Sequence, residues 1–429
     1  MQPDYSSRAA RIMQRIHALA AISEDADGVT VTRTFGTPAF LQGRALVQSW
    51  FDAAGLATRL DGIGNLRARL PSANPGAKTF VLASHIDTVV NAGKFDGPLG
   101  VLMGLDLLES LREQPAALPF HVELIAFSDE EGVRFHSTYL GSTVVAGSFD
   151  HSWLTRADAG GITLARALET MEADTARIAD DAIPAADWLG YFEMHIEQGP
   201  VLWEREIPVA LVTAIAGQMR VELTFSGMAG HAGTVPMNMR QDALCAAAEF
   251  ILIAEQFALQ HGRGLVATVG QLALRHAASN VIPGEVVLSL DLRSPDAVLL
   301  ADAYGALKNY TEALAAQRNV ALGWNLVQET APVACDAGLN ETLAGAIADA
   351  GHEVVALVSG AGHDAVPISA VAPATMLFIR CYKGISHNPL EDVEAADLAA
   401  AIEVADRFLA RLAVVVAQSN DEATAGQRS

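Results

Sequence analysis

Short apolar runs that end abruptly at polar residues recur along this chain. Residues 80–84 and 122–127 are largely apolar and lead directly into polar, loop-like residues, a pattern that is typical of buried parallel strands. Residues 100–108 between them have a helical pattern. The order strand, helix, strand predicts an α/β layer with helices on its faces, in which ligands bind at the carboxyl ends of the strands.

A different pattern begins near residue 214, where apolar and polar residues alternate around Val221, Leu223 and Phe225 and again over 287–293. A helical stretch over about 240–259 lies between them. Alternation predicts an antiparallel sheet with one face exposed, so this segment is expected to be an α+β insert.

Apolar runs return after residue 331, notably over 354–358 and 374–379. We therefore predict an α/β fold in which residues 1–213 and 331–429 form a discontinuous catalytic domain. Its sheet is expected to be mixed, mostly parallel and flanked by helices. Residues 214–330 are predicted to form an inserted α+β lid or dimerisation domain with an antiparallel sheet.

Composition excludes several partners. Fifty acidic residues against 28 basic ones give a formal net charge of −22, which opposes binding to nucleic acid or to an anionic membrane surface. No window is expected to span a bilayer. The three cysteines, Cys245, Cys335 and Cys381, are far apart, and they are expected to be reduced thiols in a cytoplasmic protein.

Polar segments at or near the ends of apolar runs carry the residue types that bind metal ions. The inventory drawn from them is three histidines, one aspartate and two adjacent glutamates, and the segments are Ser84–Asp87, Gly93–Gly97, Asp129–Gly132, Met194–Gly199 and Ser386–Pro389. Divalent zinc or manganese accepts such a ligand set, and one carboxylate remains to act as a base. The inventory predicts a two-metal hydrolase.

His85 alone would more often be an ordinary hydrogen-bonded histidine. Asp87 follows it at i+2, a spacing that lets a carboxylate hold the second ring nitrogen of a metal-bound imidazole. Asp96 lies in a Gly/Pro-rich turn before a helix, where it is either a helix cap or a carboxylate that bridges two cations.

Glu130 and Glu131 are the sharpest local signal. Two adjacent carboxylates beside buried apolar residues are costly unless a cation neutralises them. Neighbouring side chains on a turn point in different directions. We therefore predict that Glu131 ligates, while Glu130 acts as the general base and later protonates the departing nitrogen.

Several longer segments resemble the amidase, hydantoinase and carbamoylase family of two-metal amidohydrolases, which is related to zinc exopeptidases of the carboxypeptidase G type. The resemblance covers nearly the whole chain and rests on SHIDTVVNAGKFDGPLG, FSDEEGVRF, HIEQGPVL, GHAGTVPMNMRQDA, SNVIPGEV, LDLR, SGAGHDA and SHNPLEDV. The family implies two divalent ions per subunit, Zn²⁺ or Mn²⁺. By position, His85 and His195 would hold one ion, Glu131 and His387 the other, and Asp96 would bridge them.

The resemblance also implies roles outside the metal ligands. His231 would reach the active site of a partner subunit in a homodimer and polarise the scissile carbonyl oxygen, although a structural histidine in a turn is the plain alternative. Asn280 and Arg293 would hold the substrate carboxylate, for which the planar guanidinium is suited. The remaining pocket residues would be Gln198, Gly362 and His363.

Two flanking segments, residues 33–39 and 127–135, are similar to those of plant-type allantoate amidohydrolases. We therefore expect a small ureido acid as substrate, with cleavage of allantoate to ureidoglycine, ammonia and carbon dioxide. Two alternatives remain. Hydrolysis of an N-carbamoyl-L-amino acid or N-carbamoyl-β-alanine would use the same catalytic residues, whereas a non-catalytic binding protein would have no need of Glu130.

Overall fold

The structure, a computed structural model, describes residues 3–113 and 118–426, without the side chains of Glu113 and 421–426. The described residues form two compact units. Unit 1 lies within 1–213, 335–357 and 363–429, and unit 2 consists of 214–334 and 358–362. Unit 2 thus includes 331–334 and 358–362, which the sequence pattern placed in the catalytic domain.

The larger sheet has nine strands in the order β1-β2-β4-β3-β5-β16-β6-β14, with β15 also paired to β6. Its centre is parallel, because β3 pairs in parallel with β4 and β5, and β5 with β16. The outer pairs β1–β2, β2–β4, β16–β6 and β14–β6 are antiparallel. The strands are β1 Ala57–Leu60, β2 Leu66–Leu70, β3 Thr79–His85, β4 His121–Phe127, β5 Trp188–Ile196, β6 Val209–Ile215, β14 Val333–Ala334, β15 Ala356–Ser359 and β16 Ala374–Ile379.

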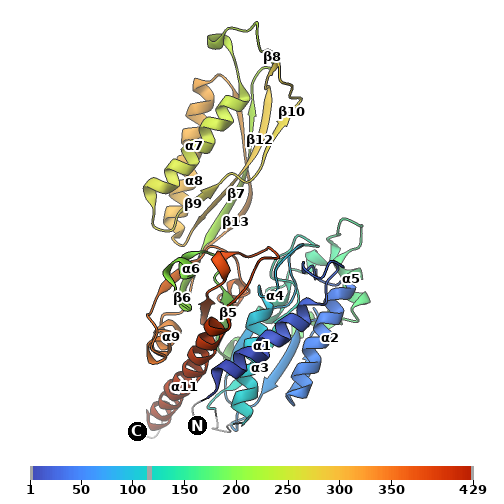
Figure 1. The fold of residues 1–429 in the computed structure, drawn as a ribbon, viewed down its shortest axis with the longest axis vertical. Helices are drawn as coiled ribbons and strands as arrows, with labels where there is room; N and C mark the ends of the chain where they lie inside the picture. The colour runs from blue at the N-terminus through green and yellow to red at the C-terminus, as the bar shows by residue number, and fades with distance from the viewer. Residues whose placement is uncertain (1–2, 114–117, 427–429) are drawn as a thin grey trace. The chain divides into compact units, whose positions relative to one another are not determined.

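Helices cover this sheet, and α1 packs against α2, α3 and α11 (Figure 1). The helices of unit 1 are α1 Tyr5–Ala20, α2 Pro38–Ala53, α3 Pro98–Glu113, α4 Leu140–Ala146, α5 Leu164–Thr170, α6 Val201–Arg205, α9 Ala337–Asp349, α10 Ala365–Ile368 and α11 Ala395–Gly426. The mixed α/β architecture expected from the apolar runs is therefore confirmed.

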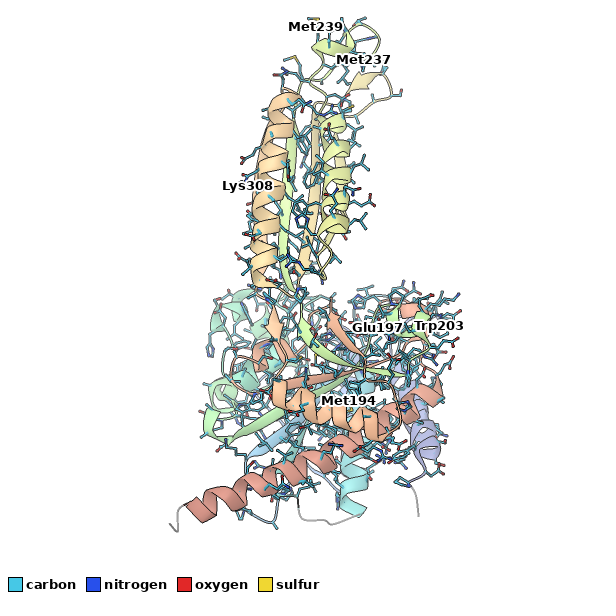
Figure 2. The ribbon with its side chains drawn as sticks, turned by 90° about the vertical axis from the view of Figure 1, so that its left-hand side faces the viewer. Met194, Glu197, Trp203, Met237, Met239 and Lys308 are labelled. Atoms are coloured by element: carbon cyan, nitrogen blue, oxygen red, sulfur yellow. The ribbon has the colours of Figure 1, made fainter. Side chains whose placement is uncertain are left out.

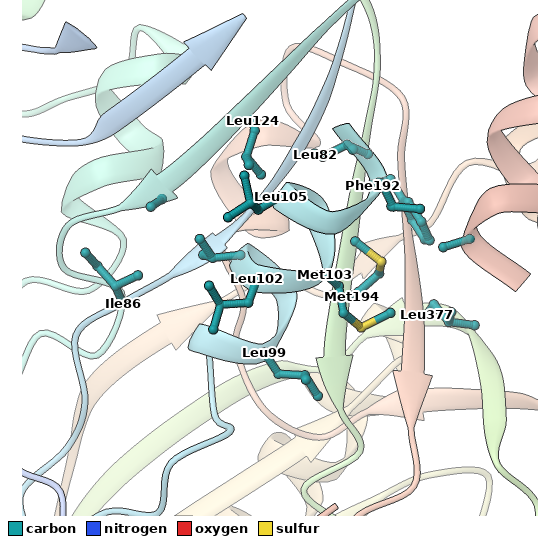
Figure 3. Close-up of a cluster of buried hydrophobic side chains, with 14 of the residues drawn as sticks. Leu82, Ile86, Leu99, Leu102, Met103, Leu105, Leu124, Phe192, Met194 and Leu377 are labelled. Atoms are coloured by element: carbon teal, nitrogen blue, oxygen red, sulfur yellow. The ribbon is translucent and has the colours of Figure 1, made fainter. Parts of the chain in front are cut away.

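The central strands are apolar because both faces of the sheet are covered. Every residue of β3, β4 and β16 is buried. Figure 3 shows Leu102, Met103 and Leu105 of α3 packed toward side chains of the strands, among them Leu82, Leu124, Phe192, Met194 and Leu377. This core fixes the carboxyl ends of β3, β4 and β5, from which the candidate ligands project.

Unit 2 contains an antiparallel sheet in the order β10-β12-β7-β13, with β9 also paired to β12. Alternate residues of β7 and β12 are buried, and α7 and α8 pack against these strands (Figure 1). The second, antiparallel sheet with one covered face is thus confirmed. Its elements are β7 Gly217–Ser226, β8 Gly230–His231, α7 Ala243–His261, β9 Val266–Thr268, β10 Leu272–Arg275, β11 Val281–Ile282, β12 Glu285–Ser294, α8 Ala297–Gln317 and β13 Ala321–Thr330.

Helix α7 corrects one expectation from the sequence. It is long and apolar enough, by length and composition, to cross a membrane, although no such window was expected. Its buried residues, which include Ala247 and Phe250, belong to the core of unit 2. Packing on the sheet thus accounts for one face of α7, whereas Leu252 and Leu259 on the helix are exposed.

Candidate metal centre

Asp96 lies at the centre of the candidate site, in the loop between β3 and α3. Its Oδ1 is 3.1 Å from Nε2 of His195 and 3.9 Å from Nε2 of His85. Its Oδ2 is 3.0 Å from Nε2 of His387. Asp96 is shared by two groups that could each hold an ion, one with His85 and His195 and the other with Glu131 and His387.

The two buried histidines end neighbouring parallel strands, His85 at the last residue of β3 and His195 next to the last residue of β5. Their ring centroids are 5.8 Å apart. Nδ1 of His85 is 3.1 Å from the carbonyl oxygen of Asp87, and Nδ1 of His195 is 3.0 Å from that of Ile196. Donation from Nδ1 to these carbonyls leaves Nε2 unprotonated, as a metal ligand requires.

Asp87 does more than the sequence spacing indicated. Its carboxylate Oδ1 is 3.5 Å from Nδ1 of His85. The backbone carbonyl oxygen of Asp87 lies closer to the same Nδ1, at 3.1 Å. The two carboxylate oxygens instead accept hydrogen bonds from the backbone N–H groups of Glu130 (3.1 Å) and Glu131 (3.2 Å). Asp87 therefore fixes the turn that carries the adjacent glutamates.

Glu130 and Glu131 follow β4 and have different surroundings. Glu131 Oε1 is 3.3 Å from Nε2 of His387, so Glu131 belongs to the second ligand group. Burial raises the pKa of Glu130 well above its ordinary value, and the negative charge of Glu131 acts in the same direction. A carboxylate with a raised pKa is suited to accept a proton and release it again.

The chemistry of the donor set fits divalent cations. Asp96 Oδ1 is buried and accepts no hydrogen bond from the described residues, although two imidazole nitrogens converge on it. Buried carboxylates without a neutralising cation are costly, and a set of imidazole and carboxylate ligands suits zinc or manganese.

Two of the predicted pocket residues also lie at this centre. Gln198 donates from Nε2 to Asp96 Oδ2 at 2.9 Å, and its φ of 57° is a strained value for a non-glycine residue. The buried ring of His363 has its centroid 4.6 Å from that of His195. Burial lowers the pKa of His363 well below its ordinary value, which keeps the imidazole neutral.

The other predicted substrate residues, His231, Asn280, Arg293 and Gly362, belong to unit 2. His231 is exposed in β8, which pairs with β11, and the N–H of Ala232 donates to the carbonyl oxygen of Asn280. The exposed Met237 and Met239 mark the same end of unit 2 in Figure 2. Asn280 and His231 are thus neighbours.

Arg293 lies near the other end of β12. Eight residues separate Glu285, where β12 begins, from Arg293, which corresponds to about 27 Å of strand. Asn280 precedes Glu285, so within one chain Asn280 and Arg293 cannot hold the same small carboxylate. The expectation that they act as a pair therefore requires that Asn280 comes from a second chain.

Arg293 is held firmly within unit 2. Its Nε and Nη2 donate to the two oxygens of Asp291 at 2.8 and 3.0 Å, and Nη1 donates to the carbonyl oxygen of Gly360 at 2.5 Å. Gly360 lies two residues before Gly362 in the predicted glycine-rich pocket segment. Asp291 was not identified from the sequence, although the i+2 spacing in LDLR places both side chains on one face of the strand.

Comparison with known proteins agrees with this architecture. Residues 81–411 match the model of the peptidase family M20/M25/M40. The chain belongs to this family. It is 38% identical to an N-carbamoyl-L-amino acid amidohydrolase of Geobacillus stearothermophilus, over 92% of this chain and 96% of that protein. It is 37% identical to an allantoate deiminase of Arabidopsis thaliana, over 90% of this chain and 79% of that protein.

A solved amidase of the hydantoinase/carbamoylase family from Burkholderia multivorans has the same fold, with a TM-score of 0.88 and 32% identity over 94% of this chain and 97% of that one. The family resemblance inferred from the motifs is confirmed. The chain is a hydrolase of the amidohydrolase class that acts on C–N bonds other than peptide bonds.

Proposed function

We propose that this M20-family protein is a two-metal amidohydrolase that cleaves the ureido group of allantoate to ureidoglycine, ammonia and carbon dioxide. The observation that carries the proposal is the position of Asp96, whose two oxygens face two separate ligand groups. Ligands for two ions and a buried glutamate beside them are what a hydrolytic two-metal site requires.

Each residue of the site has a role in this proposal. When bound, the two ions would acidify the attacking water and polarise the substrate carbonyl. Glu130 accepts the proton of the water and passes it to the departing nitrogen, while Asp87 holds Glu130 through its backbone. Arg293 holds the substrate carboxylate, with its guanidinium oriented by Asp291.

We also propose a homodimer formed through unit 2. In the described sheet, β10 and β13 are the end strands, and an unpaired strand edge favours pairing with another chain. A second chain would also bring together Asn280 and His231 of one subunit with Arg293 of the other. His231 would then polarise the carbonyl oxygen of a substrate bound to its partner.

The choice of allantoate is supported by the flanking segments 33–39 and 127–135 and by the relatives named allantoate deiminase. These two segments contact each other, because Arg134 Nη1 donates to the carbonyl oxygen of Phe35 at 3.1 Å. Phe35 and Phe135 are buried. The contact between the two segments is therefore a packing contact, and within 127–135 it is Glu130 and Glu131 that lie at the metal centre.

An N-carbamoyl-L-amino acid is the second candidate, and one observation favours it. The open face of the unit 2 sheet has a cavity of about 1000 Å³ beside Arg293. Its lining includes the apolar residues Val266, Leu272, Val287 and Val327. From the sequence, no large hydrophobic pocket was expected, and such a pocket suits an apolar amino-acid side chain better than a second ureido group.

One assay separates these candidates. Protein stripped of metal is reloaded with Mn²⁺ or Zn²⁺, and ammonia release is measured with allantoate, N-carbamoyl-β-alanine and several N-carbamoyl-L-amino acids. We expect the highest kcat/KM with allantoate and two ions per chain. A higher kcat/KM with N-carbamoyl-L-leucine or N-carbamoyl-L-methionine would establish the second candidate, and no ammonia from any substrate would refute both.

A further inference from the structure

The segment that carries His387 contains a second residue that is tied to the metal centre. Glu391 is 1% exposed. Its Oε1 accepts hydrogen bonds from the backbone N–H groups of Phe95 (2.6 Å) and Asp96 (3.0 Å). A third group, the hydroxyl of Ser386, also contacts Glu391. None of these three groups is charged, so Glu391 is held in place by hydrogen bonds and not by an ion pair with them.

Ser386 connects Glu391 to the side chain of Asp96. Its hydroxyl lies 2.8 Å from Asp96 Oδ2 and 3.2 Å from Glu391 Oε2. Ser386 also directly precedes His387, whose Nε2 faces the same Asp96 oxygen. The hydroxyl has one hydrogen and donates to one of these two carboxylates at a time, so Glu391 is bonded to the backbone of Asp96 directly and contacts its side chain through Ser386.

This arrangement controls the direction of each Asp96 oxygen. Bonds to the N–H groups of Phe95 and Asp96 fix the loop. The Ser386 hydroxyl, together with Nε2 of Gln198, holds Oδ2 toward His387, which leaves Oδ1 toward His195. We propose that Glu391 is a positioning residue that sets the bridging orientation of Asp96 and thereby the affinity for the second ion. The inference rests on the proposed metal centre and is independent of the substrate.

Two substitutions separate hydrogen-bond acceptance from charge. In Glu391→Gln the amide oxygen can still accept from both backbone N–H groups, and its NH₂ group can donate to the Ser386 hydroxyl. Glu391→Leu removes the acceptor and leaves both N–H groups buried without a partner. Asp392→Asn changes the exposed neighbouring residue and serves as the matched control.

The test is the binding of Co²⁺ to metal-free protein. Calorimetry measures the number and affinity of the bound ions, and the visible absorption spectrum reports their ligand surroundings. Wild type is expected to bind two ions. Loss of a residue that orients a ligand typically weakens metal binding about 10- to 100-fold, so Glu391→Leu should weaken the second ion by at least about 10-fold and change its absorption. Glu391→Gln and Asp392→Asn should resemble wild type.

Circular dichroism establishes whether Glu391→Leu folds. If it does not, Ser386→Ala decides, because this variant removes the hydroxyl contacts to Asp96 Oδ2, Glu391 Oε2 and Gln198 Nε2 and leaves Glu391 to accept from both backbone N–H groups. Weaker binding of the second ion supports the inference. Wild-type affinity for both ions in folded Glu391→Leu or Ser386→Ala would overturn it, as would a single ion in wild type. Because no substrate is used, absence of ammonia release would refute the proposed function alone.

Discussion

At the scale of single residues, the difference between Glu130 and Glu131 decides the chemistry. Asp87 holds the backbone N–H of both, yet only Glu131 lies within 3.3 Å of His387 Nε2. We predict that Glu130→Gln binds two ions but loses turnover by about 100-fold or more, the effect of a removed general base. Elemental analysis and ammonia release measure the two properties on the same sample.

Glu131→Gln is the matched control for that experiment, because the change is identical and the position is adjacent. It should lose affinity for one ion, since a neutral amide is a weaker ligand for a divalent cation than a carboxylate. Near-normal rates in a metal-replete Glu130→Gln protein would show that Glu130 is not the base.

Arg293 is expected to select substrates that carry a carboxylate. Its guanidinium is oriented by Asp291 through two hydrogen bonds, and a lysine cannot reproduce this fork. A hydrogen bond to a charged group contributes about 1.5–3 kcal/mol, so Arg293→Lys should lower kcat/KM for the ureido acid by roughly 10-fold or more. Metal content should stay unchanged.

The neutral amide of the same substrate is the control for Arg293. Wild type should cleave the acid far better than the amide, and Arg293→Lys should narrow that difference. Equal turnover of acid and amide by wild type would contradict the carboxylate role.

The sequence predicted the residues whose signal is local. His85 ends an apolar strand, and Glu130 and Glu131 lie in the turn just after another. An apolar strand that stops beside such residues can be recognised without a structure. Glu391 could not be recognised in this way, because its partners are the backbone N–H groups of Phe95 and Asp96, almost 300 positions away. No spacing in the sequence encodes that contact.

At the scale of elements, the loop between β3 and α3 is closely packed against the histidine that it serves. Gly97 has a φ of +82°, and a Cβ built there would lie 2.4 Å from the ring of His85. Gly161 has a similar φ of +80° with nothing within 4 Å. A substitution at Gly161 therefore introduces backbone strain alone, whereas a substitution at Gly97 introduces the same strain and a steric clash with His85.

We predict that Gly161→Ala lowers the free energy of unfolding by about 1–2 kcal/mol through backbone strain. Gly97→Ala should cost more and should also weaken metal binding, because the new methyl group displaces His85. Chemical denaturation measures the first effect and Co²⁺ titration the second. Equal losses of stability for both variants, with unchanged metal affinity, would contradict the steric argument.

Element prediction succeeded where burial follows a simple rule. Strands β3, β4 and β16 are buried along their whole length, and a continuous apolar run is the expected sequence of such strands. It did not predict β14 as a strand, although its two residues pair with Ile215 and Ala214 of β6 in the larger sheet, where the sequence pattern had placed 331–334. A two-residue strand that pairs over more than 100 positions leaves no periodic pattern, so the sequence gives no signal for it.

At the scale of the whole molecule, the candidate residues fall into two sets. The metal ligands and Glu130 belong to unit 1, whereas His231, Asn280 and Arg293 belong to unit 2. Within unit 2, the length of β12 separates Asn280 from Arg293, at about 3.4 Å per residue over eight residues. This separation is the physical reason to expect that a complete site uses residues from two chains.

Mixed dimers test that expectation. We predict that Glu130→Gln and His231→Ala homodimers are each nearly inactive, whereas mixing the two proteins under conditions of subunit exchange restores part of the ammonia release. A mixed dimer in which His231 acts on its partner has one site with both residues intact, so statistical exchange should give up to about one quarter of wild-type activity. Exchange is verified with chains that differ in mass, and a mixture of unexchanged dimers is the control. No recovery after verified exchange would show that His231 acts within its own chain or has no catalytic role.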